Sequence, residues 1–218
     1  MLELDQAIKE LSDLAKQQKL IIFVGSGISL KSGLPLWDDF LNLFIEFCNG
    51  LRKTYASYTE IENLFPDELL NDATKQASSK PTHVATVLKD RMSKLPTNLR
   101  TNVENDFKRW FVSLFVTAKE NSQHHWIVST NYPFILTSNY DTLLEDAAKS
   151  VGAPYASVSF YEKGLLAEIL YNQDPAIIHV HGSAFDAVMD KVIFTSEDYI
   201  KIIKKESPGF HFPCSLYF

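Results

Sequence analysis

Three short polar segments of this chain carry side chains that could do chemistry, and each follows a run of apolar residues. The first is Gly25-Ser26-Gly27, where small residues let the backbone approach a ligand closely. The second contains Asn139 and Asp141, an amide and a carboxylate that together donate and accept hydrogen bonds. The third contains His181, and an imidazole is the usual general base near neutral pH. These residues predict a polar binding site with one group able to move a proton.

The glycine turn indicates a phosphate-bearing ligand, because a helix that begins after it would direct its first amides at the same place. The turn does not fit the dinucleotide fingerprint G-x-G-x-x-G, which would need glycine where Leu30 stands. It does not fit the P-loop pattern either, because no Gly-Lys-Ser/Thr follows. A hydride-transfer enzyme and a nucleoside triphosphatase are therefore disfavoured.

Each candidate residue also has an interpretation without chemistry. The glycines can serve the geometry of a tight turn alone, and Asp141 can cap the helix that follows it. Asn139 can simply hydrogen-bond within its loop, and a single histidine such as His181 is more often structural than catalytic. We interpret His179, inside the apolar run, as a packed core histidine. We expect His124-His125 on the surface or at a helix end.

Apolar runs and spacings predict alternating strands and helices. The predicted strands are residues 20–24, 133–137, 176–180 and 191–195. The predicted helices are residues 3–19, residues 36–47 with an end at Asn49-Gly50, and residues 196–205 with Ser196 as N-cap. Residues from about 51 to 128 are polar and helix-prone, with one good helix around 107–115, and we interpret them as a helical insertion.

This alternation predicts an α/β fold: a Rossmann-like parallel sheet flanked by helices, with the helical insertion, in a single domain over residues 1–218. Ligands of such sheets bind beyond the carboxyl ends of the strands. All three polar segments would meet at that edge.

Composition excludes several classes of protein. The 218 residues are 45% hydrophobic, which suffices for a core, and the net charge of −6 argues against a nucleic-acid partner. No apolar run approaches the length that crosses a bilayer, and the N-terminus does not resemble a signal peptide, so we expect a cytoplasmic protein without a membrane partner. The cysteines Cys48 and Cys214 form no C-x-x-C motif, and we expect no metal site.

Taken in order, GSGIS, TSNYD and HGS resemble the three signature segments of the sirtuin family, which reads GAGIS, then Q-N-x-D, then HG. The resemblance spans roughly residues 20–200, with about 51–128 unmatched. It is closer to the sirtuin-like domains of bacterial anti-phage defence proteins, which have segments similar to residues 33–37 and 193–199 of this chain.

The resemblance implies an NAD⁺ hydrolase that cleaves nicotinamide from NAD to give ADP-ribose, in antiviral defence and without a metal. Asn139 would hold the nicotinamide ribose and orient water, His181 would act as the base, and Asp141 would accept from the nicotinamide carboxamide. It also implies a set of NAD-binding residues: Gly25, Ser26, Gly27, Ile28, Ser29, Asp141, Gly182 and Ser183.

Two other functions stay open: a non-catalytic module that senses NAD or ADP-ribose, and an NAD-dependent protein deacylase. The deacylase is the weaker alternative, because the four-cysteine zinc module is missing and Leu36-Trp37-Asp38 replaces the Asp-Phe-Arg of the deacetylases. Relatives usually continue with at least one more strand, whereas this chain ends soon after Tyr199. We therefore expect either a shortened fold or an edge completed by a second copy or a partner subunit.

Overall fold

The computed structural model describes residues 4–17, 20–186 and 191–204 of the chain. They divide into two compact units, the first comprising Met1–Leu36 and Asp106–Val192, the second Trp37–Asn105 and Ile193–Phe218. All of the sequence-predicted site residues belong to the first unit. None of the helices in the described part is long and apolar enough to cross a membrane.

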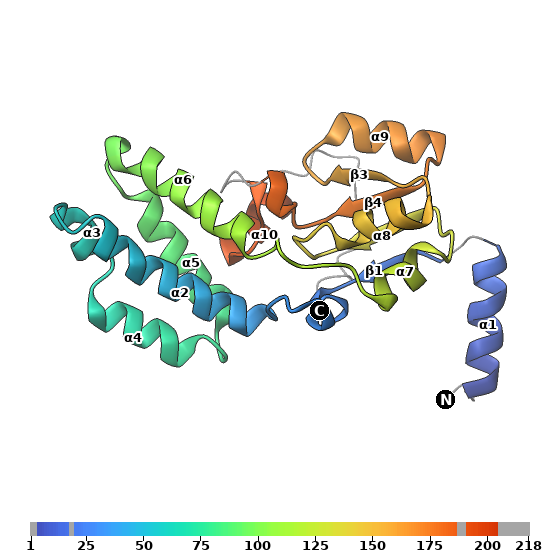
Figure 1. Cartoon of the computed structure of the whole chain (residues 1–218), viewed down its shortest axis with the longest axis horizontal. Helices are drawn as coiled ribbons and strands as arrows, with labels where there is room; N and C mark the ends of the chain where they lie inside the picture. The colour runs from blue at the N-terminus through green and yellow to red at the C-terminus, as the bar shows by residue number, and fades with distance from the viewer. Residues whose placement is uncertain (1–3, 18–19, 187–190, 205–218) are drawn as a thin grey trace. The chain divides into compact units, whose positions relative to one another are not determined.

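The first unit is built on a four-stranded parallel sheet (Figure 1). Its strands are β1 (Ile22–Val24), β2 (Phe134–Thr137), β3 (Ala156–Ser159) and β4 (Ala176–His179), and their order across the sheet is β1-β2-β4-β3. The middle strands β2 and β4 are almost wholly apolar, as expected for strands that are covered on both faces. The predicted α/β class and the Rossmann-like parallel sheet flanked by helices are confirmed.

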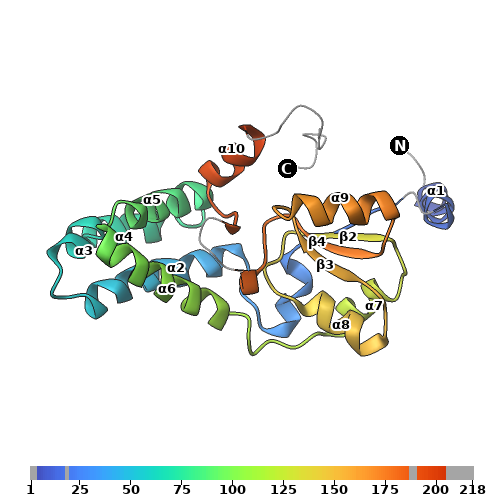
Figure 2. The ribbon, with the colours of Figure 1, turned by 90° about the horizontal axis from the view of Figure 1, so that it is seen from above.

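Helices cover both faces of this sheet (Figure 2). On one face, α7 (Ser122–Val128) and α8 (Leu143–Val151) bury Val128, Leu144 and Ala147 against Val24, Ile135 and Ile177. On the other face, α9 (Lys163–Asn172) buries Leu166 and Ile169 against Leu136, Val158 and Ile178. The first unit also contains α1 (Leu4–Lys16) and short 3₁₀ helices, among them η1 (Ser26–Ile28), η2 (Leu30–Ser32) and η3 (Ala184–Asp186).

The second unit is helical. It contains α2 (Trp37–Thr54), α3 (Thr59–Leu64), α4 (Asp67–Gln76), α5 (Pro81–Ser93) and α10 (Ser196–Lys204). The boundary between the units falls inside α6 (Thr97–Ser113), between Asn105 and Asp106. Phe194 enters the core of the second unit, where its ring meets Phe40 and Phe44 of α2 edge-to-face.

The predicted end of the helix over residues 36–47, the predicted N-cap Ser196 and the predicted strand over residues 191–195 were wrong. Helix α2 does not end at Asn49-Gly50 but continues to Thr54, because the buried side chains Cys48 and Leu51 outweigh the helix penalty of Gly50. Residues 191–195 form no strand. Their apolar side chains are buried by packing, and the amides of Phe194 and Thr195 donate to the carboxylate of Asp198 instead of to a neighbouring strand.

The same carboxylate explains why Ser196 is not the N-cap of α10. The Oγ1 of Thr195 accepts a hydrogen bond from the Asp198 amide at 3.1 Å, and Asp198 accepts from the Thr195 amide at 3.1 Å. This is a reciprocal capping box one residue earlier than predicted. The strand β3, with sequence ASVS, was not predicted, because it contains no run of apolar residues.

The ion pair between Lys89 and Asp198 ties α10 to α5, so we expect it to control the stability of the second unit. The pair lies at 2.9 Å, and its side chains are 12% and 9% exposed. Asp198→Ala removes the carboxylate partner of a buried ammonium together with the cap of α10, and should lower the free energy of unfolding by about 3 kcal/mol. Urea denaturation measures this loss.

The matched control is Asp90→Ala, which removes the exposed ion pair with Lys94 at 2.7 Å. An exposed pair contributes little, so this variant should lose about 1 kcal/mol or less. Equal losses in the two variants would contradict the role given to Asp198.

Candidate functional site

The three predicted segments meet at the carboxyl edge of the sheet, because the strand hydrogen bonding continues into the loops. The amide of Ser138 donates to the Val24 carbonyl at 3.1 Å, and the amide of Val180 donates to the Thr137 carbonyl at 2.9 Å. Further along the loops after β2 and β4, the Ala184 amide donates to the Tyr140 carbonyl at 2.8 Å. The loop after β2 therefore lies between the glycine turn after β1 and the His181 loop after β4.

The glycine turn differs from the prediction in one respect. No α-helix follows it; the chain forms the 3₁₀ helices η1 and η2. Among the described residues, the amides of Ser26 and Gly27 donate no hydrogen bond, whereas the Ile28 amide donates to the Gly25 carbonyl at 3.3 Å. Both free amides belong to exposed residues. A ligand would meet these single amides rather than the aligned amides of a long helix.

The fold itself does not require glycine at positions 25 and 27. Gly25 has φ −115° and ψ 177°, which is ordinary extended backbone, and Gly27 does not have a positive φ. Among the described residues, a Cβ built on Gly27 would meet no atom within 4 Å, and one built on Gly25 would meet the Ser138 hydroxyl at 3.9 Å. The turn geometry alone therefore does not explain these residues, whereas the close approach of a ligand would.

Ser29 joins the first segment to the second. Its buried hydroxyl donates to Oδ2 of Asp141 at 2.9 Å and accepts from Nδ2 of Asn139 at 3.1 Å. The third partner is Nε2 of His124, at 3.3 Å. One donated and two accepted bonds use the full capacity of a hydroxyl group.

His124 is a site residue that the sequence analysis missed. It was expected at the surface or at a helix end; it lies in the first turn of α7 but is fully buried. Its Nδ1 accepts from the Asn121 amide at 3.1 Å, so the neutral ring carries its proton on Nε2 and donates to Ser29. Burial lowers the pKa of His124, against the opposing charge of Asp141, and favours this neutral form. The capping pattern Asn-x-x-His was the available signal.

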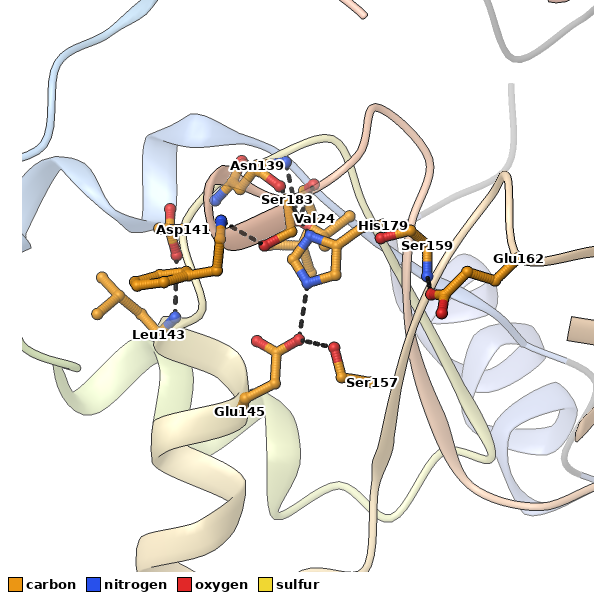
Figure 3. A network of polar contacts seen from close by, with 12 residues as sticks. Val24, Asn139, Asp141, Leu143, Glu145, Ser157, Ser159, Glu162, His179 and Ser183 are labelled. Carbon is orange, nitrogen blue, oxygen red and sulfur yellow. Dashed lines mark hydrogen bonds and ion pairs between the residues drawn. The ribbon is translucent and has the colours of Figure 1, made fainter. Parts of the chain in front are cut away.

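Asp141 uses both carboxylate oxygens within the protein, and Figure 3 shows its contact with Leu143. Oδ2 accepts from Ser29, and Oδ1 accepts from the Leu143 amide at 3.1 Å, an Asx turn at the start of α8. Burial raises the pKa of Asp141, while these hydrogen bonds lower it in opposition. The sequence-based expectation that Asp141 caps the helix therefore fits its position, and its contact with Ser29 gives it a second role.

Asn139 forms three hydrogen bonds, through its backbone amide, its backbone carbonyl and its side-chain Nδ2. Its amide N–H donates to Oγ1 of Thr137 at 3.0 Å, and its carbonyl accepts from Nδ1 of His179 at 3.0 Å. Its side-chain Nδ2 donates to Ser29. The side-chain Oδ1 is buried and has no hydrogen-bond partner within the described part of the chain, although the residue is only 5% exposed. An orphaned buried carbonyl is costly, and a bound donor would satisfy it.

His181 lies beside this residue, in the turn after β4. Its ring is half-buried and hydrogen-bonds to the backbone of Ser138, the neighbour of Asn139. Burial lowers the pKa of His181 to about 4, so the ring is neutral near pH 7 and can accept a proton. The next residue, Gly182, has φ +80°, and a Cβ there would lie 2.4 Å from the Lys191 carbonyl oxygen. Only glycine fits this turn.

The structure thus places the predicted residues in two groups. Ser29, Asn139 and Asp141 are in direct contact, and His181 reaches the same loop through Ser138. The remaining predicted binding residues border them. Ile28 is half-buried, with its carbonyl accepting from Asn121 Nδ2 at 2.8 Å, and Ser183 is buried and accepts from the Phe185 amide at 3.3 Å. Within the described residues, no group of three or more potential ligands is placed to hold a metal ion.

Residues 133–213 match the family model described as SIR2-like domain. The match includes the second and third motifs, with Asn139, Asp141 and His181, and bears out the sirtuin-like domain predicted from the sequence. It supports a function that involves NAD in general terms. No curated protein matches the chain.

Two glycine substitutions separate ligand approach from fold geometry. Gly27→Ala should leave the thermal unfolding midpoint unchanged, because its Cβ meets no atom within 4 Å. It should weaken NAD binding by roughly tenfold or more, the effect of losing one close backbone contact to a charged group. Calorimetric titration with NAD measures this change.

Gly182→Ala is the contrasting variant, since its Cβ would collide with backbone at 2.4 Å. It should cost about 2 kcal/mol of stability or more. If Gly27→Ala binds NAD as tightly as the unmodified protein, the glycine turn is not part of the binding site.

Proposed function

We propose that this chain is an NAD⁺ hydrolase that releases nicotinamide and ADP-ribose. The observation that carries the proposal is the unpartnered Oδ1 of Asn139, held at the carboxyl edge of the sheet beside a neutral histidine. A ribose hydroxyl or a water molecule supplies the missing donor. The match to the SIR2-like domain model supports NAD as the molecule that carries this ribose.

The glycine turn is proposed to hold the pyrophosphate. The exposed Ser26 and Gly27 amides donate to its oxygens, and the missing side chain of Gly27 leaves room for close approach. Gly25 follows β1 directly and borders Ser138, so the phosphates and the ribose occupy neighbouring parts of one sheet edge. Ile28, Gly182 and Ser183 border the same region.

The reaction breaks the bond between C1′ of the ribose and the pyridinium nitrogen. The bonding electrons go to that nitrogen, and nicotinamide leaves as a neutral molecule, so no general acid is required. A water oxygen forms the new bond to C1′, and the water proton goes to the ring of His181. The products are nicotinamide, ADP-ribose and one proton, which His181 releases to solvent.

Asn139 orients the reacting groups in this proposal. Its Oδ1 accepts from the ribose hydroxyl or from the attacking water, and its Nδ2 is fixed on Ser29. Ser29 is itself fixed by Asp141 and His124, so the amide cannot rotate without breaking a buried hydrogen bond. Because the amide is fixed in advance, the attacking water is held in the correct position, and this raises the reaction rate.

The remaining implications of the resemblance belong to the same proposal. They are the role in bacterial antiviral defence and association with a second copy or a partner subunit. Association is favoured by the edge strand β1, where Phe23 is 48% exposed and the preceding Ile21 is 60% exposed. A protein that binds NAD tightly and releases no nicotinamide would instead be the sensing module.

Removal of either central side chain tests the proposed reaction. Asn139→Ala and His181→Ala should each lower kcat for nicotinamide release by about 100-fold or more, the range for loss of positioning or of a general base. The measurement is chromatographic detection of nicotinamide with purified protein and NAD.

His125→Ala is the control: it removes a histidine of α7 whose side chain is 38% exposed and contacts Ser150 and Glu120 rather than the site. It should hydrolyse NAD at the unmodified rate. Folded Asn139→Ala and His181→Ala variants with full activity would overturn the assigned roles, and nicotinamide release by the unmodified protein excludes the sensing module.

A further inference from the structure

His179, the last residue of β4, is buried between two hydrogen-bond acceptors (Figure 3). Its Nδ1 lies 3.0 Å from the backbone carbonyl of Asn139, and its Nε2 lies 2.7 Å from Oε1 of Glu145. A carbonyl can only accept, and an ionised carboxylate can only accept. Both ring nitrogens therefore carry a proton, and His179 is an imidazolium ion. The burial of His179 agrees with the sequence-based expectation of a core histidine, but its two polar contacts indicate that it does more than fill space.

Glu145 supplies the countercharge. It lies in the first turn of α8, where the helix dipole favours a carboxylate, and its Oε1 also accepts from the Ser157 hydroxyl of β3 at 2.7 Å. Its second oxygen, Oε2, is buried and has no hydrogen-bond partner among the residues that the structure describes. The carboxylate thus depends on His179 and Ser157 for compensation. The other charge that acts on His179 is Asp141, in the loop after β2.

We infer that His179 is a positioning residue that holds the Asn139 carbonyl and thereby directs the Asn139 side chain toward the ligand. This inference rests on the proposed function of Asn139. The backbone of Asn139 has two anchors, Thr137 on its amide and His179 on its carbonyl, and the side chain has a third at Ser29. Losing the His179 anchor would free the peptide group that follows Asn139, and a misplacement of about 1 Å costs roughly 100-fold in rate.

The anchor exists only while both ring nitrogens are protonated. When the imidazolium loses one proton, the single remaining proton can serve either Asn139 or Glu145, and the carboxylate is the stronger acceptor. Asn139 then loses its donor. Activity should therefore fall as the pH rises through the pKa of His179.

Burial lowers the pKa of His179, but the hydrogen bond and charge of Glu145, the Asn139 carbonyl and Asp141 raise it more, so the net shift is upward from 6.5. A raised pKa means that the stabilising effect is complete below pH 6.5 and is lost as the pH rises through the folded-state value. Both kcat and stability should decline on the alkaline side. The decline of kcat at low pH is set by other groups, including His181 with its pKa of about 4.

Glu145→Gln tests this coupling, because the amide keeps a hydrogen-bond acceptor and removes the charge. It should move the alkaline decline of kcat toward lower pH by about 1 to 3 pH units, the effect of losing a nearby opposite charge. The value of kcat below the decline and the KM for NAD should stay near those of the unmodified protein. Glu162→Gln is the control: this carboxylate binds the Ser159 amide at 2.8 Å and does not contact His179. Its pH profile should be unchanged.

Two substitutions of His179 separate its two hydrogen bonds. In His179→Asn the amide nitrogen stands near the position of Nδ1 and can donate to Asn139, whereas in His179→Gln it stands near Nε2 and can reach only Glu145. The Asn variant should keep a larger kcat than the Gln variant by about tenfold or more. It should also lose the alkaline decline, because its donor does not titrate. Thermal unfolding of each variant establishes that it is folded.

Nitrogen NMR of labelled histidine tests His179 independently of any reaction. At pH 7 both of its ring nitrogens should carry protons, and in Glu145→Gln this state should disappear at lower pH than in the unmodified protein. A neutral His179 at pH 7, an unshifted profile in Glu145→Gln, or equal kcat for the Asn and Gln variants would overturn the positioning role. Absence of nicotinamide release by the unmodified protein would instead overturn the proposed reaction, with the NMR result standing by itself.

Discussion

The Ser29 hydroxyl is the interaction on which the candidate site depends. A hydroxyl donates one hydrogen bond and accepts two, and Ser29 directs these to Asp141, Asn139 and His124. Its partners lie 95 to 112 residues further along the chain, and all four side chains are buried. An alanine at this position would leave a carboxylate, an amide and an imidazole without their shared partner. Leaving three buried polar groups without this hydrogen-bond partner would cost free energy, and this cost keeps the glycine-turn segment next to the segment that contains Asn139 and Asp141.

The short sheet makes this arrangement possible. Its strands contain only three or four residues, yet parallel register places their carboxyl ends at one edge. The hydrogen bonding continues past the strands, from Ser138 to Val24 and from Val180 to Thr137. The loops are thereby held by backbone contacts before any side chain is considered. The functional groups therefore lie in irregular segments that backbone hydrogen bonds attach to the sheet.

The sequence predicted the parts of this site that are local. Apolar runs followed at once by glycine, Asn139 or His181 identified three strand ends, and the parallel topology followed from their alternation with helices. His124 escaped prediction because its role depends on a partner 95 residues away, and adjacent polar residues in a helix usually indicate a surface. Residues 191–195 looked like a strand because burial by packing and burial in a sheet select the same apolar side chains. The deciding residue, Asp198, lies outside that run.

The two histidines of the sequence His179-Val180-His181 illustrate how partners, rather than burial alone, decide protonation. His179 is buried and His181 half-buried, and the burial of each ring by itself lowers its pKa and favours the neutral form. His181 hydrogen-bonds to the Ser138 backbone and stays neutral, whereas His179 faces a carboxylate and a carbonyl and stays charged. A pyridinium substrate that becomes an oxocarbenium ion would be repelled by a cation at the reacting atom. The proposed chemistry therefore requires a neutral base near the substrate, and it tolerates the imidazolium of His179 because Glu145 neutralises that charge behind Asn139.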